Sequence, residues 1–297
     1  MKREEIRVRD PYVVYLDGVY YLYVTTGERT LSYYTSRDLA EFSEGGVAFE
    51  IAEDFWAYKD VWAGEVHLYR GRYYLFVTLL GKDGMRGTQV AVADTPKGPF
   101  LPLKNGPVTP LGCIDGTLFL EGEVPYIIYS HDWPNCYDAK VDAYVGEICA
   151  APLTPDLEEL AGEPQILFRS DEVPVSARTP HHITWQGKPA TRYGSDAPFV
   201  QALSDGRLFL TWSPYLQDNY VVLGAISESG SVLGPWRHLD TPVFDKNGGH
   251  AMFFTDGKGR CLMSLHAPEK WGQERATLLE VGEGADGYTV IREVFEV

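Results

Sequence analysis

The fold is decided by the stretch RDPYVVYLDGVYYLYVT, residues 9–25, in which two apolar and aromatic runs flank the pair Asp17-Gly18. Alternation at period two on both sides of an Asp-Gly pair predicts a β-hairpin. Asp10 stands at the start of the first strand. Carboxylates before strands are common turn residues, so this position has no functional meaning when it is considered alone.

The same pattern returns four more times along the chain as a strand, a glycine-containing turn and a second strand. The hairpins begin at intervals of roughly 50 to 80 residues, which is typical of the four-stranded blade of a β-propeller. The residues that lead the five hairpins are Asp10, Glu65, Asp115, Asp196 and His250. We therefore predict an all-β fold, a single five-bladed β-propeller over residues 1–297 with four antiparallel strands in each blade.

In a propeller the first strand of each blade lines the central axis, so the five lead residues are expected to meet at one mouth of it. A strand near the C-terminus is expected to complete a blade with the N-terminus and close the ring. The longest interval between hairpins, residues 153–195, is expected to be an insertion beside the mouth.

Composition and charge narrow the classes of function. A formal net charge of −16 opposes binding to nucleic acid or to an anionic membrane and suits a neutral substrate. The aromatic content of 13% serves packing and also provides platforms on which sugars stack. The first residues lack the apolar core of a signal peptide, and the four cysteines show no C-x-x-C spacing. We therefore expect a cytoplasmic protein with reduced thiols.

Several carboxylates at one mouth of an acidic, aromatic-rich protein indicate hydrolysis of a glycosidic bond. One carboxylate must be ionised to take a proton from water, and another must be protonated to donate a proton to the leaving oxygen. A third carboxylate near the acid raises the pKa of the acid, because like charges disfavour a second ionisation. The sequence contains no phosphate-binding glycine loop, no Gly-x-Ser-x-Gly elbow and no His-Glu-x-x-His motif.

Aromatic and polar residues near the predicted mouth are candidates for substrate binding. Trp62 directly precedes an axial strand, where it would be a stacking wall or, equally, a buried anchor. His131 and Trp133 follow the second strand of the third hairpin, where His131 would orient a substrate hydroxyl or cap a loop. The complete set of candidate substrate-binding residues is Trp62, Glu65, His131, Trp133, His250 and Arg275.

Four short motifs stand at the starts of predicted blades. They are Arg9-Asp10-Pro11, Trp62-Ala63-Gly64-Glu65-Val66, Ile114-Asp115-Gly116-Thr117-Leu118-Phe119 and Gly248-Gly249-His250-Ala251-Met252. In this order they resemble the blade motifs of glycoside hydrolase family 43, over nearly the whole chain. The resemblance implies a five-bladed propeller that releases arabinofuranose or xylose from plant polysaccharides, mostly with inversion.

The resemblance also implies roles for individual residues. Asp10 matches the general base, Asp115 the residue that tunes and orients the acid, and Asp196 the position of the general acid. His250 matches an axial position where some members hold Ca²⁺ through water, so it is the candidate metal residue, and no cofactor is expected to be required. The family acid is usually a glutamate followed by Gly-Pro, whereas this chain has Asp196-Ala197-Pro198. Aspartate is one methylene shorter, so its carboxyl reaches roughly 1–1.5 Å less far.

Three interpretations of the shorter acid are open. Asp196 acts as the acid in a tighter site, Glu65 or Glu147 replaces it, or catalysis is lost while sugar binding is kept. We favour the first, because the base and the modulator are retained. The predicted function is that of an exo-acting inverting glycoside hydrolase on oligosaccharides, with α-L-arabinofuranosidase ahead of β-xylosidase and β-galactosidase. A non-catalytic sugar-binding propeller is the alternative from another class.

Overall fold

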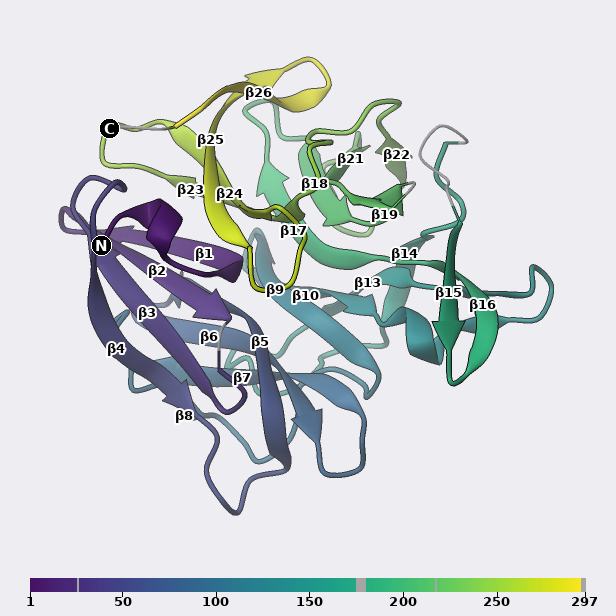
Figure 1. The fold of residues 1–297 in the computed structure, drawn as a ribbon, viewed down its shortest axis with the longest axis horizontal. Helices are drawn as coiled ribbons and strands as arrows, with labels where there is room; N and C mark the ends of the chain where they lie inside the picture. Colours follow the sequence, from purple (N-terminus) through teal and green to yellow (C-terminus); the bar gives the residue numbers. More distant parts are fainter. Residues whose placement is uncertain (26, 175–179, 217, 295–297) are drawn as a thin grey trace.

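The computed structural model describes residues 1–25, 27–174, 180–216 and 218–294 of this all-β protein (Figure 1). Besides strands, the described residues form two short 3-10 helices, η1 (Arg3–Glu5) and η2 (Trp133–Asn135). Neither of these described helices has the length and apolar character needed to cross a membrane.

Five of the described sheets contain four antiparallel strands each, and together they account for all five predicted hairpins. The first two sheets consist of β1 (Arg9–Leu16), β2 (Val19–Thr25), β3 (Thr30–Ser36) and β4 (Phe42–Glu50), and of β5 (Ala57–Tyr69), β6 (Arg72–Gly81), β7 (Arg86–Ala93) and β8 (Leu101–Pro102). The third consists of β9 (Cys113–Glu121), β10 (Val124–His131), β13 (Glu147–Pro152) and β14 (Gln165–Arg169). The fourth and fifth consist of β17 (Asp196–Ala202), β18 (Leu208–Ser213), β21 (Leu223–Ser227) and β22 (Trp236–His238), and of β23 (Gly249–Thr255), β24 (Cys261–Ala267), β25 (Arg275–Gly284) and β26 (Gly287–Glu293).

The first hairpin forms as its sequence predicts. Asp17 and Gly18 both have positive φ angles, 49° and 78°, as the two central residues of a type I′ turn require. This turn matches the right-handed twist of the strands that it joins, and it pairs Leu16 with Val19. The Asp-Gly pair therefore fixes the register that points Tyr21 and Tyr23 into the core.

The first strands of the five sheets form a closed series of contacts. β1 contacts β5, β5 contacts β9, β9 contacts β17, β17 contacts β23, and β23 returns to β1. Apolar cores fill the spaces between neighbouring sheets. Between the third and fourth sheets, for example, the fully buried ring of Trp212 packs against Phe168 with ring centroids 5.5 Å apart. Truncating such a ring to alanine costs about 3–5 kcal/mol, so these cores hold the sheets in place.

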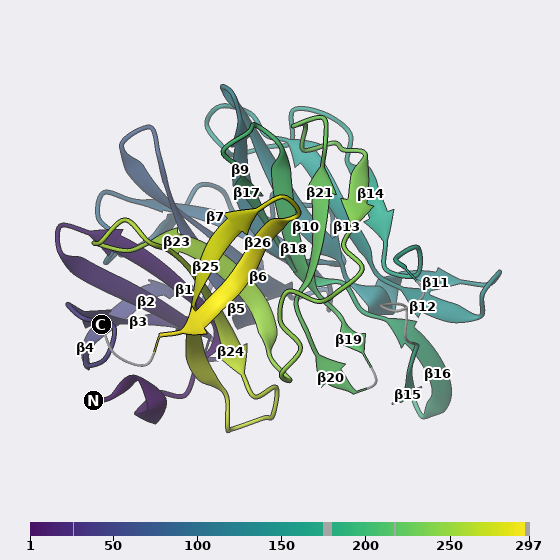
Figure 2. The same cartoon turned by 90° about the horizontal axis from the view of Figure 1, so that it is seen from above.

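Two smaller sheets stand apart from the five. One, the insertion sheet, consists of β11 (Tyr137–Asp138), β12 (Ala143–Val145), β16 (Lys188–Tyr193) and β15 (His181–Trp185), in that order. It projects from one side of the molecule in both views (Figures 1 and 2). The other is the ribbon of β19 (Tyr215–Leu216) and β20 (Asn219–Tyr220). The expected insertion at residues 153–195 thus supplies only half of the insertion sheet, because β11 and β12 precede it.

The expectation that a C-terminal strand completes a sheet with the N-terminus is wrong. In the described ranges the first sheet contains only β1–β4, and the last strand, β26, pairs with β25. Hydrogen bonds join the two ends of the chain instead. The Val8 amide donates to the Glu274 carbonyl at 3.2 Å, and Arg3 Nη2 donates to the Val294 carbonyl at 2.7 Å.

Candidate active site

Each first strand contains an irregularity, and the residues of the site lie at or next to these irregularities. In all five sheets the pairing of the first and second strands shifts register there, as at a β-bulge. One non-glycine residue in each bulge has a positive φ angle. These residues are Asp10 (50°), Ala63 (47°), Asp115 (55°), Ala197 (54°) and His250 (61°). Strained backbone of this kind clusters at functional sites.

The bulges correct the predicted alignment of the lead residues. Asp10, Asp115 and His250 occupy equivalent positions. Asp196, however, directly precedes the equivalent residue Ala197, and Glu65 lies beyond Gly64 on the far side of its bulge. A shift of one residue along a strand turns a side chain to the opposite face, so the five lead residues do not all point the same way.

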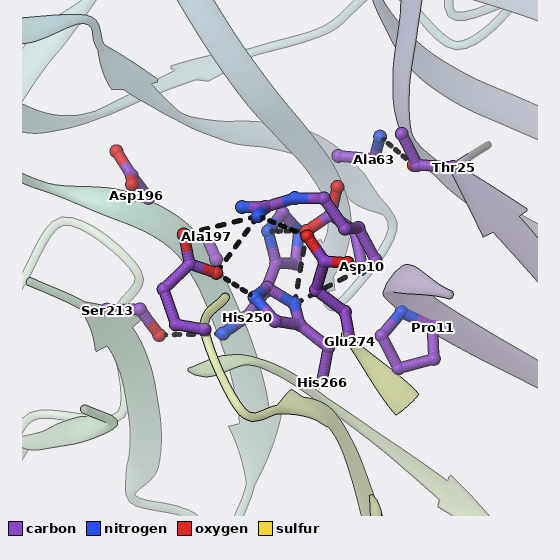
Figure 3. Close-up of polar contacts among 12 residues, drawn as sticks. Asp10, Pro11, Thr25, Ala63, Asp196, Ala197, Ser213, His250, His266 and Glu274 are labelled. Carbon is purple, nitrogen blue, oxygen red and sulfur yellow. Dashed lines mark hydrogen bonds and ion pairs between the residues drawn. The ribbon is translucent and has the colours of Figure 1, made fainter. Parts of the chain in front are cut away.

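The backbone of each left-handed residue is held by a side chain from the preceding sheet, and Figure 3 shows the contacts that Thr25 and Ser213 make. In four cases its amide donates to a side chain of the second strand of that sheet. The pairs are Ala63–Thr25 (2.9 Å), Asp115–Thr78 (2.8 Å), His250–Ser213 (2.9 Å) and Asp10–His266 (3.3 Å). In the fifth case the Ala197 amide donates to Asp115 Oδ2 at 3.0 Å. The site residues of one sheet are thus positioned by the sheet before it.

One cavity of about 470 Å³ brings the predicted catalytic residues together. The three aspartates Asp10, Asp115 and Asp196 all line it, as do Trp62 and His250. The remaining residues of its described wall are Arg7, Arg9, Thr25, Gly27, Glu28, Asp60, Ile114, Tyr220 and Trp271. The cavity therefore joins carboxylates from the first, third and fourth sheets with an imidazole from the fifth.

Asp10 is held in its ionised form. Its Oδ1 lies 3.1 Å from Nδ1 of His250 (Figure 3). Burial raises the pKa of Asp10, but the charge and hydrogen bond of His250, together with the charge of Arg9, hold that pKa well below its usual range. A carboxylate that stays ionised at every physiological pH is equipped to accept a proton from water.

His250 lies between two carboxylates, because its Nδ1 is also 4.0 Å from Oδ2 of Asp115. Burial lowers the pKa of His250, but the charges of Asp10 and Asp115 outweigh burial and raise the pKa to about 9. The residue is therefore an imidazolium at neutral pH that donates a hydrogen bond from Nδ1 to Asp10. Its charge partly compensates the desolvation of the two buried aspartates.

Asp115 and Asp196 hold protons at a pH where ordinary aspartates are ionised. Burial raises the pKa of Asp115 to about 7, with the charges of Asp196 and Asp10 adding to it and that of His250 opposing. Burial also raises the pKa of Asp196 to about 6, helped by the charge of Asp132. Asp115 accepts a hydrogen bond from the Ala197 amide, directly after Asp196, so it helps to fix the position of Asp196, while the charge of Asp196 raises the pKa of Asp115.

Several residues that support the site lie outside the motifs from which the site was predicted. Arg9 Nη1 lies 3.0 Å from Glu269 and 3.2 Å from Glu274, and it neutralises part of the acidic surroundings of Asp10. Nε2 of His266 lies 2.6 Å from Glu269, which leaves Nδ1 free to accept from the Asp10 amide. Tyr220 donates its hydroxyl to Asp196 Oδ2 at 3.4 Å. Except for Arg9, no quoted motif contains these residues.

The other two candidates for the acid lie elsewhere. The buried carboxylate of Glu65 accepts from the Thr117 hydroxyl at 2.5 Å and pairs with His67 at 2.9 Å. Glu147 pairs with Nδ1 of His131 at 2.9 Å on the third sheet. Neither glutamate belongs to the described wall of the cavity. The structure therefore places the carboxylate of Glu65 against Thr117 and His67. It places the imidazole of His131 against Glu147, and neither Glu65 nor His131 belongs to the described wall of the cavity.

Trp133 and Arg275 are also absent from the described wall. Trp133 packs against Trp185 of the insertion sheet with ring centroids 4.8 Å apart. Arg275 donates from Nε to the Glu4 carbonyl at 2.7 Å and so ties β25 to η1. Trp62, in contrast, lines the cavity, with the Arg86 guanidinium 4.2 Å from the centroid of its ring. It is both an anchored residue and part of the wall.

An all-β fold in which one cavity gathers an ionised carboxylate and two carboxyls with raised pKa values defines a glycoside hydrolase. The chain belongs to glycosyl hydrolases family 43, whose family profile matches residues 5–293.

Relatives of known name agree with this assignment. A "Xylosidase/arabinosidase" of Bacteroides ovatus is 24% identical over 229 residues, which cover 73% of this chain and 68% of that protein. The solved structure of an endo-arabinase from Bacteroides thetaiotaomicron VPI-5482 is 35% identical, with a TM-score of 0.86 over 97% of this chain and 98% of that one. A β-xylosidase/α-arabinofuranosidase from a compost microbial metagenome, solved with xylotriose in a calcium-free form, shares the fold at 19% identity, with a TM-score of 0.73 and coverage of 97% and 95%.

Proposed function

We propose that this enzyme removes terminal α-L-arabinofuranose residues from oligosaccharides with inversion at the anomeric carbon. The observation that carries the proposal is the cavity in which Asp10, Asp115 and Asp196 meet. Arabinose as the sugar is supported by the similarity to an endo-arabinase at 35% identity. A β-xylosidase is the second candidate, favoured by the name of the Bacteroides ovatus relative.

The proposed mechanism divides the labour between two carboxyl groups. Asp10 takes a proton from a water molecule whose oxygen forms a bond to the anomeric carbon. Asp196 gives its proton to the glycosidic oxygen as the bond between that oxygen and the anomeric carbon breaks. Asp115 keeps the Ala197 amide in place and favours the protonated form of Asp196, while His250 keeps Asp10 ionised. The sugar passes through a transition state that resembles an oxocarbenium ion.

The assignment of the acid to Asp196 rests on position and proton affinity. Of the three candidate acids, only Asp196 belongs to the described wall of the cavity, and burial raises its pKa to about 6. The shorter side chain of Asp196 is held in a fixed position, because the Ala197 amide that follows it donates a hydrogen bond to Asp115. Inversion requires the carboxyls of Asp10 and Asp196 to lie about 6.5–9.5 Å apart around the attacking water.

We also propose that the five sheets are the blades of a propeller whose axis is lined by β1, β5, β9, β17 and β23. The support is the closed series of contacts between these strands and the bulge that each of them repeats. A crystal structure in which the five sheets are not related by rotation about one axis would contradict this.

A Ca²⁺ ion at the axis fits one feature of His250. Its Nε2 is buried and has no hydrogen-bond partner among the described residues. We propose that His250 would hold a hydrated Ca²⁺ through water on this atom, which requires the ion to displace the Nε2 proton, so that the neutral ring donates from Nδ1 and accepts from the water at Nε2. Such an ion would supply positive charge beside the acidic cavity. Asp10 and Asp115 would still pair with Nδ1.

Nitrophenyl glycosides of arabinofuranose, xylose and galactose test the function directly. We expect the arabinofuranoside to be turned over fastest, with NMR showing the inverted anomer as the first product. Asp10→Ala and Asp196→Ala should each remove turnover of an arabino-oligosaccharide while the oligosaccharide still binds. Linear arabinan separates terminal from internal cleavage, since terminal cleavage yields only arabinose at early times. Activity unaffected by both substitutions would refute the assignment, and binding without turnover by the unmodified protein would support a non-catalytic sugar-binding propeller.

A further inference from the structure

A second cluster of reactive side chains lies on the third sheet, outside the described wall of the carboxylate cavity. His131 at the end of β10 is paired directly with Glu147 at the start of β13. Nδ1 of His131 lies 2.9 Å from Oε2 of Glu147. Cys136, which caps η2, completes the cluster, because one ligand atom from each of the three residues lies within 4.8 Å of the other two.

The ligand atoms of this cluster lie close enough together to surround a small cation. A tetrahedral zinc ion with ligands at about 2.0–2.3 Å places neighbouring ligand atoms about 3.3–3.8 Å apart. The distance between Nδ1 of His131 and Oε2 of Glu147, 2.9 Å, lies just below this range, and all three ligand atoms lie within 4.8 Å of one another. Strand pairing fixes two of the ligands, and the hydrogen bond between His131 and Glu147 already aims both groups at each other. The Cys136 sulfur makes only long contacts, to the carbonyl oxygens of His131 and Asp132 at 3.6 and 3.5 Å.

The cluster is shielded but reachable. The side chain of His131 is 33% exposed and that of Glu147 is 16% exposed. Two cavities, of about 210 and 240 Å³, adjoin the pair, and both are lined by His131 and Glu147. They provide an access path for an ion and room for a water molecule as a fourth ligand.

We propose that His131, Cys136 and Glu147 bind a transition-metal ion of the zinc class, with water as the fourth ligand. A thiolate and an imidazole select such ions over Ca²⁺ and Mg²⁺, which prefer oxygen. On binding, the Cys136 thiol loses its proton to solvent, and His131 binds as the neutral imidazole with its remaining proton on Nε2, so that Nδ1 can hold the ion. The thiolate and the carboxylate then balance the double charge of the ion.

The ion would connect three parts of the structure. It would join η2 to β10 and β13, and therefore join the start of the insertion sheet to the third sheet. The same junction is also held by aromatic packing between Trp133, Tyr144 and Trp185 and by the ion pair of Asp138 with Arg169 at 2.8 Å. The site is structural, and its occupancy can be measured independently of hydrolysis.

Titration of the chelator-treated full-length protein with Co²⁺, followed by competition with Zn²⁺, tests the proposal. We expect one equivalent of Co²⁺ to bind with a thiolate-to-cobalt charge-transfer band that Zn²⁺ abolishes. Cys136→Ser should remove the band and weaken binding by more than about 100-fold, because even changes outside the ligand set cost about 10–100-fold. Cys261→Ser is the matched control, since this thiol lies on β24 of the fifth sheet, and it should bind Co²⁺ as the unmodified protein does.

Glu147→Gln provides a second variant of nearly unchanged shape. It should keep the band, since the thiol remains, and weaken binding at least about tenfold. Circular dichroism of each metal-free variant checks that the sheets are intact. Absence of the band in the unmodified protein, unchanged affinity in both Cys136→Ser and Glu147→Gln, or loss of binding in Cys261→Ser would each overturn the proposal.

Discussion

Replacing Asp196 by asparagine keeps the shape of the side chain and removes the proton that the mechanism requires. Proton donation by a positioned acid contributes about 10²–10⁴-fold to rate, or about 3–5 kcal/mol at 1.36 kcal/mol per tenfold. The raised pKa of Asp196, about 6, also sets the pH above which the rate should fall. The active form is protonated, so at pH 7 roughly one molecule in ten holds the proton. Activity should therefore fall about tenfold per pH unit above pH 6.

The assay compares two arabinofuranosides with different leaving groups across pH 4 to 8. An alkyl or sugar leaving group needs the proton of Asp196, so Asp196→Asn should lower kcat/KM by about 10²–10⁴-fold for it. A dinitrophenolate leaves without protonation, so its kcat/KM should fall less than about tenfold. In the variant, the alkaline decline near pH 6 should also disappear for the alkyl or sugar substrate.

Asp17→Asn is the matched control, because Asp17 is exposed at the hairpin tip at the other end of β1 and asparagine tolerates its φ of 49°. This variant should keep both the rate and the pH profile. Equal losses of Asp196→Asn on the two leaving groups, or an alkaline limb that stays in place, would refute the assignment of Asp196 as the acid.

Three further predictions follow from the same cavity. Asp10→Asn should lower kcat/KM by about 10²–10⁴-fold for both leaving groups alike, because each needs activated water, and selective loss on one of them would contradict this. The raised pKa of His250, about 9, stabilises the folded protein below about pH 6.5, and this stability is lost as the pH rises to about 9. Urea unfolding should therefore show the free energy of unfolding falling by up to about 3 kcal/mol across that window. Equal free energies of unfolding at both ends would count against an imidazolium. Thr78→Val removes the hydroxyl that accepts the hydrogen bond of the Asp115 amide. Urea unfolding should show a loss of about 1–3 kcal/mol in stability, and steady-state kinetics should show a lower kcat. An unchanged kcat would show that this hydrogen bond does not position Asp115.

The hairpins were predictable because each is a local feature. An Asp-Gly or Arg-Gly pair between alternating apolar runs specifies a turn and a register within about twenty residues. All five predicted hairpins are present, as is the meeting of Asp10, Asp115 and Asp196 in one cavity. Repetition explains part of this convergence, since Asp10 and Asp115 occupy equivalent bulge positions, whereas Asp196 reaches the cavity from one residue earlier.

The errors arose where the structure depends on a single residue or on contacts distant in sequence. A bulge shifts Glu65 and Asp196 relative to Asp10, and period-two patterning does not reveal where a bulge falls. The insertion sheet pairs β12 with β16 in parallel across more than forty intervening residues, a pairing that no local pattern specifies. The contact of Arg9 with Glu269 is likewise formed only in the folded chain.

The hydrogen bond from the Asp10 amide to His266 connects residues near opposite ends of the chain. During synthesis the ribosome makes His266 only after it has added 255 further residues to Asp10, since the two positions are 256 apart. A nascent chain therefore carries its water-activating group long before the imidazole that fixes it. Hydrolytic competence should consequently arise only after the fifth sheet has docked, so that unfinished chains stay inert toward the sugars around them.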